Sequence, residues 1–99
     1  MVKHVILWRL RRDHDEDDMM NKIAYCKEAF SRLKGVIPGL VSIKLHTNPL
    51  TSSNCDLMLD SVFEDEAAYI AYKNAPEHLA VASVIRPLVA ERICMDCEM

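Results

Sequence analysis

Two side chains capable of acid–base chemistry, Tyr72 and His78, stand on either side of Pro76. Because a residue that precedes proline is disfavoured in the helical conformation, Ala75 should end one helix, and Pro76 suits the first position of the next. His78 would then lie in a first helical turn, where the helix dipole favours the neutral imidazole. A neutral imidazole close to a phenol can act as a general base with a helper, so His78 and Tyr72 are candidate catalytic residues.

His4 and Trp8 are candidates for substrate binding, and both belong to the predicted first strand. They share one face of that strand with Ile6, so they would either line a pocket or lie in the core. Each candidate has a structural alternative. His4 could be a hydrogen-bonded core histidine, Tyr72 could bury its ring and bond to backbone, and His78 could only secure a helix start.

The chain has four cysteines, Cys26, Cys55, Cys94 and Cys97. The last two spell CxxC, but the residues around them alternate as in a strand, which would place the two thiols on opposite faces. A zinc site would need a second pair of ligands, and none stands at a suitable spacing. We therefore expect buried or half-buried free thiols at all four positions, and we expect no metal and no cofactor.

The overall composition narrows the class of protein. Ninety-nine residues with 51% hydrophobic content suit one domain that spans residues 1–99. A formal charge of −3 argues against a nucleic-acid partner, because phosphate binding needs a basic face. No segment approaches the roughly 20 apolar residues of a membrane span, and the apolar run from Val5 to Trp8 is short for a signal peptide. The sequence therefore predicts a cytoplasmic protein without a membrane partner.

The apolar patterns predict strands and helices in a definite order. Strand patterns occupy residues 2–11, 40–47, 55–63 and 91–98. A first helix should follow the acidic run 13–18, with Asp15 as its N-cap and Gly35 just past its end. The acidic run could also hold a metal, but carboxylates at a helix start have an ordinary explanation in the helix dipole. The second helical region is broken into residues 65–74 and 77–86.

This order, β-α-β-β-α-β, is that of a ferredoxin-like α+β sandwich, in which helices cover one face of an antiparallel sheet. The other face of the first strand still carries Val5 and Leu7, which a monomer would expose. Two such sheets packed face to face give a two-fold homodimer, a dimeric α/β barrel. Val41, Ile43 and Leu45 are expected to share one face of the second strand. Ala67, Ile70 and Ala71 are expected to point inward from the second helical region.

The sequence resembles the stress-responsive dimeric α/β-barrel family, the Dabb domain, over nearly its whole length. The matching segments are Val2-Lys3-His4-Val5, Ile37-Pro38-Gly39-Leu40, Phe63-Glu64-Asp65, Tyr72 through Leu79, and Val84-Ile85-Arg86-Pro87. The resemblance implies a homodimer with a cleft between the sheet and the helices, in a family where most members have no established activity. A plant relative is similar to a polyketide cyclase, and its catalytic pair matches His78 and Tyr72. His4 matches a pocket-lining histidine, whereas Ala75 stands where that relative has a further histidine.

Two classes of function follow. The first is a non-catalytic dimeric stress or ligand-binding domain, with a cleft for a small hydrophobic or carbonyl ligand. The alternative is a cofactor-independent lyase or cyclase, in which His78 removes a proton next to a carbonyl and Tyr72 stabilises the enolate oxygen. A monooxygenase of the same broad fold is a weaker alternative, because fold similarity alone does not carry function. A tightly filled interior would favour the non-catalytic domain.

Overall fold

The computed structural model describes residues 1–99, and its elements follow the predicted order. The strands are β1 (Val2–Leu10), β2 (Leu40–His46), β3 (Leu57–Phe63) and β4 (Val89–Glu98). The helices are α1 (Glu16–Arg32), α2 (Glu66–Asn74) and α3 (Pro76–Ile85), with short 3-10 turns at Leu33–Gly35 and Arg86–Leu88. None of these helices is both long and apolar enough to cross a membrane.

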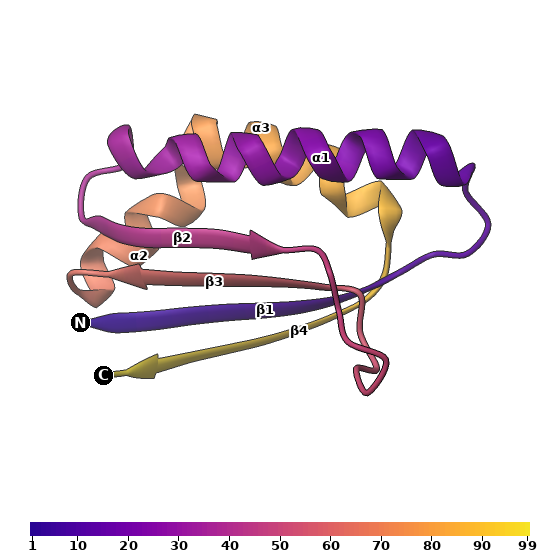
Figure 1. Ribbon diagram of the computed structural model, residues 1–99. Helices are drawn as coiled ribbons and strands as arrows, with labels where there is room; N and C mark the ends of the chain where they lie inside the picture. The colour runs from indigo at the N-terminus through magenta and orange to yellow at the C-terminus, as the bar shows by residue number, and fades with distance from the viewer.

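The four strands form one antiparallel sheet in the order β2-β3-β1-β4, and the helices lie on one face of it (Figure 1). This is the ferredoxin-like α+β fold that the sequence predicts. The first and last strands of the chain are neighbours, and in their register His4 lies opposite Asp96, while Ile6 lies opposite Cys94. Because β4 is an edge strand, its residues from Ala90 onward are exposed.

The first helix begins as predicted but ends differently. The Asp15 side chain accepts a hydrogen bond from the backbone N–H of Asp18, as an N-cap does. Gly35, however, ends the 3-10 turn that follows α1 and does not take the left-handed conformation, so the prediction that Gly35 caps the helix end is wrong. The chain turns instead at Gly39, with φ 80°.

The break at Pro76 has the predicted form. Ala75 is extended, with ψ 133°, and Pro76 is the first residue of α3. Since proline fixes its own φ and excludes the residue before it from the helical region, α3 starts a new direction here instead of continuing α2. His78 consequently lies in the first turn of α3, half-buried, on the stripe that also carries the buried Val81 and Ile85.

The predicted inward face of α2 and the predicted shared face of β2 need correction. In α2 the buried residues are Tyr69 and Tyr72, whereas Ile70 is 51% exposed, and the expected Ala67 and Ala71 are exposed as well. The reason is area: two tyrosine rings one turn apart bury more surface than the smaller side chains beside them.

In β2 a bulge between Leu40 and Ser42 shifts the register, so that Val41 is 38% exposed. The rest of the strand keeps its predicted alternation, with Leu45 buried and Ile43 half-buried against the core. A single extra residue in one strand is enough to turn the side chains before it to the other face.

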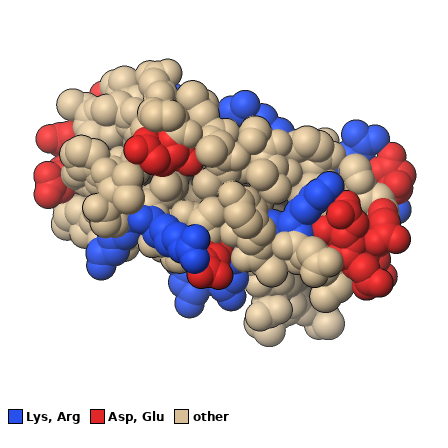
Figure 2. All heavy atoms as spheres, turned by 90° about the horizontal axis from the view of Figure 1, so that it is seen from above, with Lys and Arg blue, Asp and Glu red and all other residues tan.

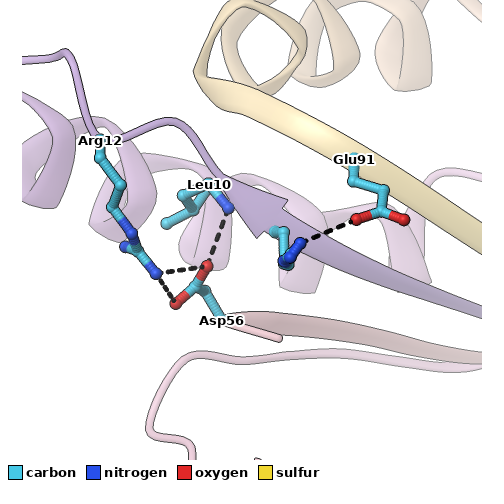
Figure 3. A network of polar contacts seen from close by, with 5 residues as sticks. Leu10, Arg12, Asp56 and Glu91 are labelled. Atoms are coloured by element: carbon cyan, nitrogen blue, oxygen red, sulfur yellow. Dashed lines mark hydrogen bonds and ion pairs between the residues drawn. The ribbon is translucent and has the colours of Figure 1, made fainter. Parts of the chain in front are cut away.

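A network of polar contacts joins the ends of β1 and β3 (Figure 3). One carboxylate oxygen of Asp56 accepts the backbone N–H of Leu10 at 2.8 Å, and the Arg12 guanidinium donates to the other at 3.0 Å. Burial alone would raise the pKa of Asp56, but these hydrogen bonds hold it below its usual value. Arg9 forms a separate ion pair with Glu91 across β1 and β4.

Charge on the helical side is distributed in separate groups (Figure 2). Acidic atoms gather at the end where α1 begins, whose first turn holds Glu16, Asp17 and Asp18. Lys and Arg atoms lie in several places and form no continuous basic surface on this side. This face therefore lacks the basic stripe that phosphate binding requires.

Candidate functional site

Three aromatic side chains from β1, α2 and α3 lie in a row beneath the helix break. The ring of Tyr72 is 4.2 Å from that of His78 and 6.4 Å from that of His4, measured between ring centres. Tyr72 is 1% exposed, and its ring lies near the rings of both histidines. The structure thus brings together three of the four site residues that the sequence singles out.

The surroundings of His78 favour its neutral form. Its Nδ1 lies 3.3 Å from the carbonyl oxygen of Lys73, which can only accept, so Nδ1 carries the proton and Nε2 keeps its lone pair. Burial lowers the pKa of His78, and the nearby positive charges of Arg86 and Arg92 act in the same direction, against the hydrogen bond to Lys73. The shift has the direction that the sequence predicts, and it leaves the imidazole ready to accept a proton at neutral pH.

The Tyr72 hydroxyl is a buried polar group without a hydrogen-bond partner. The backbone bond that would make Tyr72 purely structural is therefore not formed. Burial raises the pKa of Tyr72, so the side chain remains a phenol that can donate a proton to an acceptor. Leaving such a group unpaired costs about 1–3 kcal/mol, and a ligand oxygen would remove that cost.

His4 is 3% exposed and bonds across the sheet to its partner in β4. Its Nδ1 donates to a carboxylate oxygen of Asp96 at 2.5 Å, and its ring packs on Tyr69 with 4.7 Å between the ring centres. Burial would raise the pKa of Asp96, but hydrogen bonds from His4, Tyr69 and Cys94 hold it below its usual value. His4 is thus a satisfied buried histidine that also borders Tyr72.

Trp8 does not belong to this group. It is 5% exposed and packs on Phe30 of α1, with 6.5 Å between the ring centres. The sequence leaves open whether Trp8 is core or pocket wall, and its surroundings are those of a core residue. A role in substrate binding therefore gains no support from its position.

Three residues near the site escaped the sequence prediction: Tyr69, Cys94 and Asp96. Cys94 lies 3.7 Å from His4 Nδ1 and 3.4 Å from the Asp96 carboxylate, and burial raises the pKa of its thiol. The alternation of side chains along β4 places Cys94 and Asp96 on one face. Their closeness to His4 could not be predicted, because it depends on the pairing of β4 with β1.

The cysteines are free thiols, as predicted, although two are less buried than expected. Cys26 is buried and Cys55 half-buried, while Cys94 and Cys97 are exposed because β4 is at the sheet edge. Cys97 pairs with Lys3 and Cys94 with Ile6, which confirms that the CxxC thiols point to opposite faces.

A hollow of about 440 Å³ opens beside the site, between α2 and β4. Tyr69, Lys73 and Asp96 are among the residues that line it. Tyr72 does not line this hollow and is 1% exposed, whereas His78 is half-buried. A ligand would reach the Tyr72 hydroxyl only if the rings around it moved.

The model of the stress responsive A/B barrel domain, Dabb, matches residues 2–99. The chain belongs to this family. No curated protein sequence matches it.

Solved structures with the same fold include proteins of known and of unknown function. A dimeric ferredoxin-like protein of unknown function from Bacteroides fragilis has 26% sequence identity, 99% coverage of this chain and 95% of its own, and a TM-score of 0.91. A hydroxynitrile lyase from Passiflora edulis has 16% identity, coverages of 99% and 92%, and a TM-score of 0.76. A cofactor-independent oxygenase from Streptomyces nogalater has 16% identity, coverages of 99% and 91%, and a TM-score of 0.69.

Proposed function

We propose that this Dabb domain acts as a two-fold homodimer that binds a small hydrophobic or carbonyl compound between its sheet and its helices. The observation that carries the proposal is the buried Tyr72 hydroxyl, which has no partner in the protein. A buried polar group is normally satisfied, and one that is not marks a place where a ligand can supply the missing acceptor.

The homodimer is supported by the sheet face that no helix covers (Figure 1). Val5 and Leu7 are half-buried there, and on the neighbouring strand Ile93 is 58% and Met95 69% exposed. An apolar patch in the middle of a sheet is typical of an interface, and a two-fold axis would pair it with itself. The similar protein from Bacteroides fragilis is described as dimeric.

A charge in the middle of this patch tests the homodimer. Leu7→Asp should raise the dissociation constant of the dimer at least about 30-fold, equivalent to roughly 2 kcal/mol, because a buried carboxylate would lack a partner. The matched control is Leu79→Asp, since Leu79 is an exposed leucine of α3 on the helical side. Light scattering on the wild type at micromolar concentration shows first whether a dimer forms. A stable folded monomer would contradict the proposed homodimer.

The second candidate function is a cofactor-independent lyase or cyclase, and the free Nε2 of His78 favours it. In this reaction Nε2 takes a proton from the carbon next to a carbonyl, and the electron pair moves onto the carbonyl oxygen. The Tyr72 hydroxyl donates to that oxygen and stabilises the enolate. The enolate carbon then forms a bond or regains a proton, and the imidazolium returns its proton to the product.

Deuterium exchange on a simple hydrophobic methyl ketone, 4-phenyl-2-butanone, isolates the proton-abstraction step. In deuterated buffer the wild type should accelerate exchange, and His78→Ala should slow it about 100-fold or more. Tyr72→Phe should slow it less, and His14→Ala, outside the site, should leave it unchanged. Exchange no faster than in buffer alone would remove the catalytic function.

Mass spectrometry tests whether the protein binds a ligand without catalysing a reaction. It should detect a small molecule released from the native protein on denaturation, and Tyr72→Phe should reduce the amount of this molecule. If the wild type neither carries such a molecule nor binds the ketone, the proposed small-molecule function is contradicted.

A further inference from the structure

Three different metal-binding side chains meet on the helical face of β1 and β4: an imidazole, a thiol and a carboxylate. They belong to His4, Cys94 and Asp96, and one ligand atom from each lies within 4.8 Å of the other two. The separations are 2.5 Å from His4 Nδ1 to Asp96 Oδ1, 3.7 Å from Cys94 Sγ to Nδ1, and 3.4 Å from Sγ to Oδ1.

These separations are close to those of a tetrahedral metal site. Typical zinc bonds of about 2.3 Å to sulfur and about 2.0–2.2 Å to nitrogen or oxygen place neighbouring ligand atoms roughly 3.4–3.6 Å apart. The two sulfur distances in the protein, 3.7 Å and 3.4 Å, are within about 0.1 Å of this range. Only Nδ1 and Oδ1 would have to separate, by about 1 Å. The Asp96 side chain, 35% exposed on an edge strand, has room to move by that amount.

We propose that His4, Cys94 and Asp96 form a binding site for one divalent transition-metal ion, best suited to zinc. An imidazole, a thiolate and a carboxylate are ligands that Zn²⁺ accepts together, and three protein ligands leave a fourth position for water or another small ligand. The hollow between α2 and β4, which Asp96 lines, gives that fourth position access to solvent.

The sheet fixes the three ligands without any flexible loop. His4 and Asp96 are directly opposite in the register, and Cys94 is the diagonal neighbour two residues along β4. His4 is 3% exposed and packed against Tyr69, so its ring cannot swing away. Around the site, Glu66 and Glu98 add negative charge to the rim of the hollow, and Lys73 opposes them.

Metal binding requires two of these side chains to give up a proton from the atom that binds the ion. The Cys94 thiol, which otherwise donates to Asp96, gives up its proton to solvent and coordinates as a thiolate. Nδ1 of His4 must lose its proton to bind the metal, and the proton that the ring keeps is then on Nε2. Asp96 exchanges its hydrogen bond from His4 for the metal. The thiol alone releases one proton for each ion bound.

Titration of the reduced protein with Co²⁺, which takes tetrahedral sites and reports a thiolate ligand by its absorption, tests the site. The wild type should bind one ion per chain and show the sulfur-to-cobalt band. Zn²⁺ should displace it and raise the melting temperature, because a ligand that binds only the folded chain stabilises it. Cys94→Ser should abolish the band, and Asp96→Asn should weaken affinity at least about 10-fold, the loss typical even of an outer-shell partner.

Cys97→Ser is the matched control, because Cys97 lies on the same strand but pairs with Lys3 on the opposite face. It should leave the cobalt spectrum unchanged. The site is disproved if the wild type shows no saturable Co²⁺ binding, if Cys94→Ser binds as well as the wild type, or if Cys97→Ser loses the band too. None of these results depends on the exchange reaction of His78, so the metal site and the proposed function fail or stand separately.

Discussion

Two polar regions of the molecule differ in how completely their hydrogen bonds are made. At the end of β1, the Asp56 carboxylate accepts from the Leu10 backbone and from Arg12 (Figure 3). Beneath the helix break, the Tyr72 hydroxyl has no partner, although Tyr72 is only 1% exposed. A network whose hydrogen bonds are all made stabilises the fold. A buried group without a partner lowers the stability, and a ligand that bonds to it can restore that free energy.

The largest expected effect is the loss of the completed network. Asp56→Ala should lower the free energy of unfolding by about 1.5–3 kcal/mol, because hydrogen bonds to a charged group are lost and the Leu10 N–H is left unpaired. Chemical denaturation measures the change. Asp17→Ala, at an exposed position in the first turn of α1, is the control and should cost less. Equal losses in the two variants would mean that the network adds nothing.

Removing a polar group at Tyr72 should change the free energy of unfolding in the opposite direction. Tyr72→Phe removes a hydroxyl that bonds to nothing, so it should raise the free energy of unfolding by about 1 kcal/mol while weakening ligand binding. Thermal unfolding and ligand release, measured on the same sample, check both halves. A clear loss of stability in Tyr72→Phe would show that the hydroxyl has a structural partner.

The pH dependence of stability sharpens the contrast for Asp56. Its folded-state pKa is lowered, so its contribution is complete above the unfolded value of about 3.9 and is lost as pH falls through the folded pKa. Acid unfolding of the wild type should therefore be steeper in this range than that of Asp56→Asn. Superimposable acid-unfolding curves for the two proteins would contradict the lowered pKa.

The smallest effect concerns His78. Burial lowers its pKa, so the ring should titrate below the ordinary value of about 6.5. The stability contributed by the neutral ring is complete above the unfolded pKa and declines as pH falls toward the folded one. NMR of the histidine rings measures the shift directly. An ordinary pKa would remove the physical argument that His78 is poised as a base.

The elements, and the positions of Tyr72 and His78 on adjoining helices, could be predicted because their signals are local. The pattern around Pro76 places Tyr72 and His78 on adjoining helices, and every strand has its own apolar run. The partner of His4 could not be predicted in the same way. Asp96 is 92 residues away, and only the pairing of β1 with β4 brings the two together.

Errors in the predicted inward faces have equally specific causes. The bulge in β2 that exposes Val41 leaves no mark in the sequence, since one inserted residue changes the face but not the composition. In α2 the apolar residues Ile70 and Ala71 lose the inward position to tyrosines, whose phenol groups make them ambiguous in any hydropathy pattern. Sequence patterns find elements more easily than they find orientation.

Gly39 sets a limit on how the candidate site can change. With φ 80° its backbone is in a conformation that other residues rarely adopt, and a Cβ there would lie 2.5 Å from the Cβ of Ala68. The absent side chain is what lets α2 sit low on the sheet, and Tyr72 is carried by the same helix. No side chain larger than that of glycine fits at position 39, so the distance between α2 and the turn at Gly39 cannot be changed by substitution there. Substitutions that enlarge the candidate site for a larger ligand are therefore best made in β4 and α3.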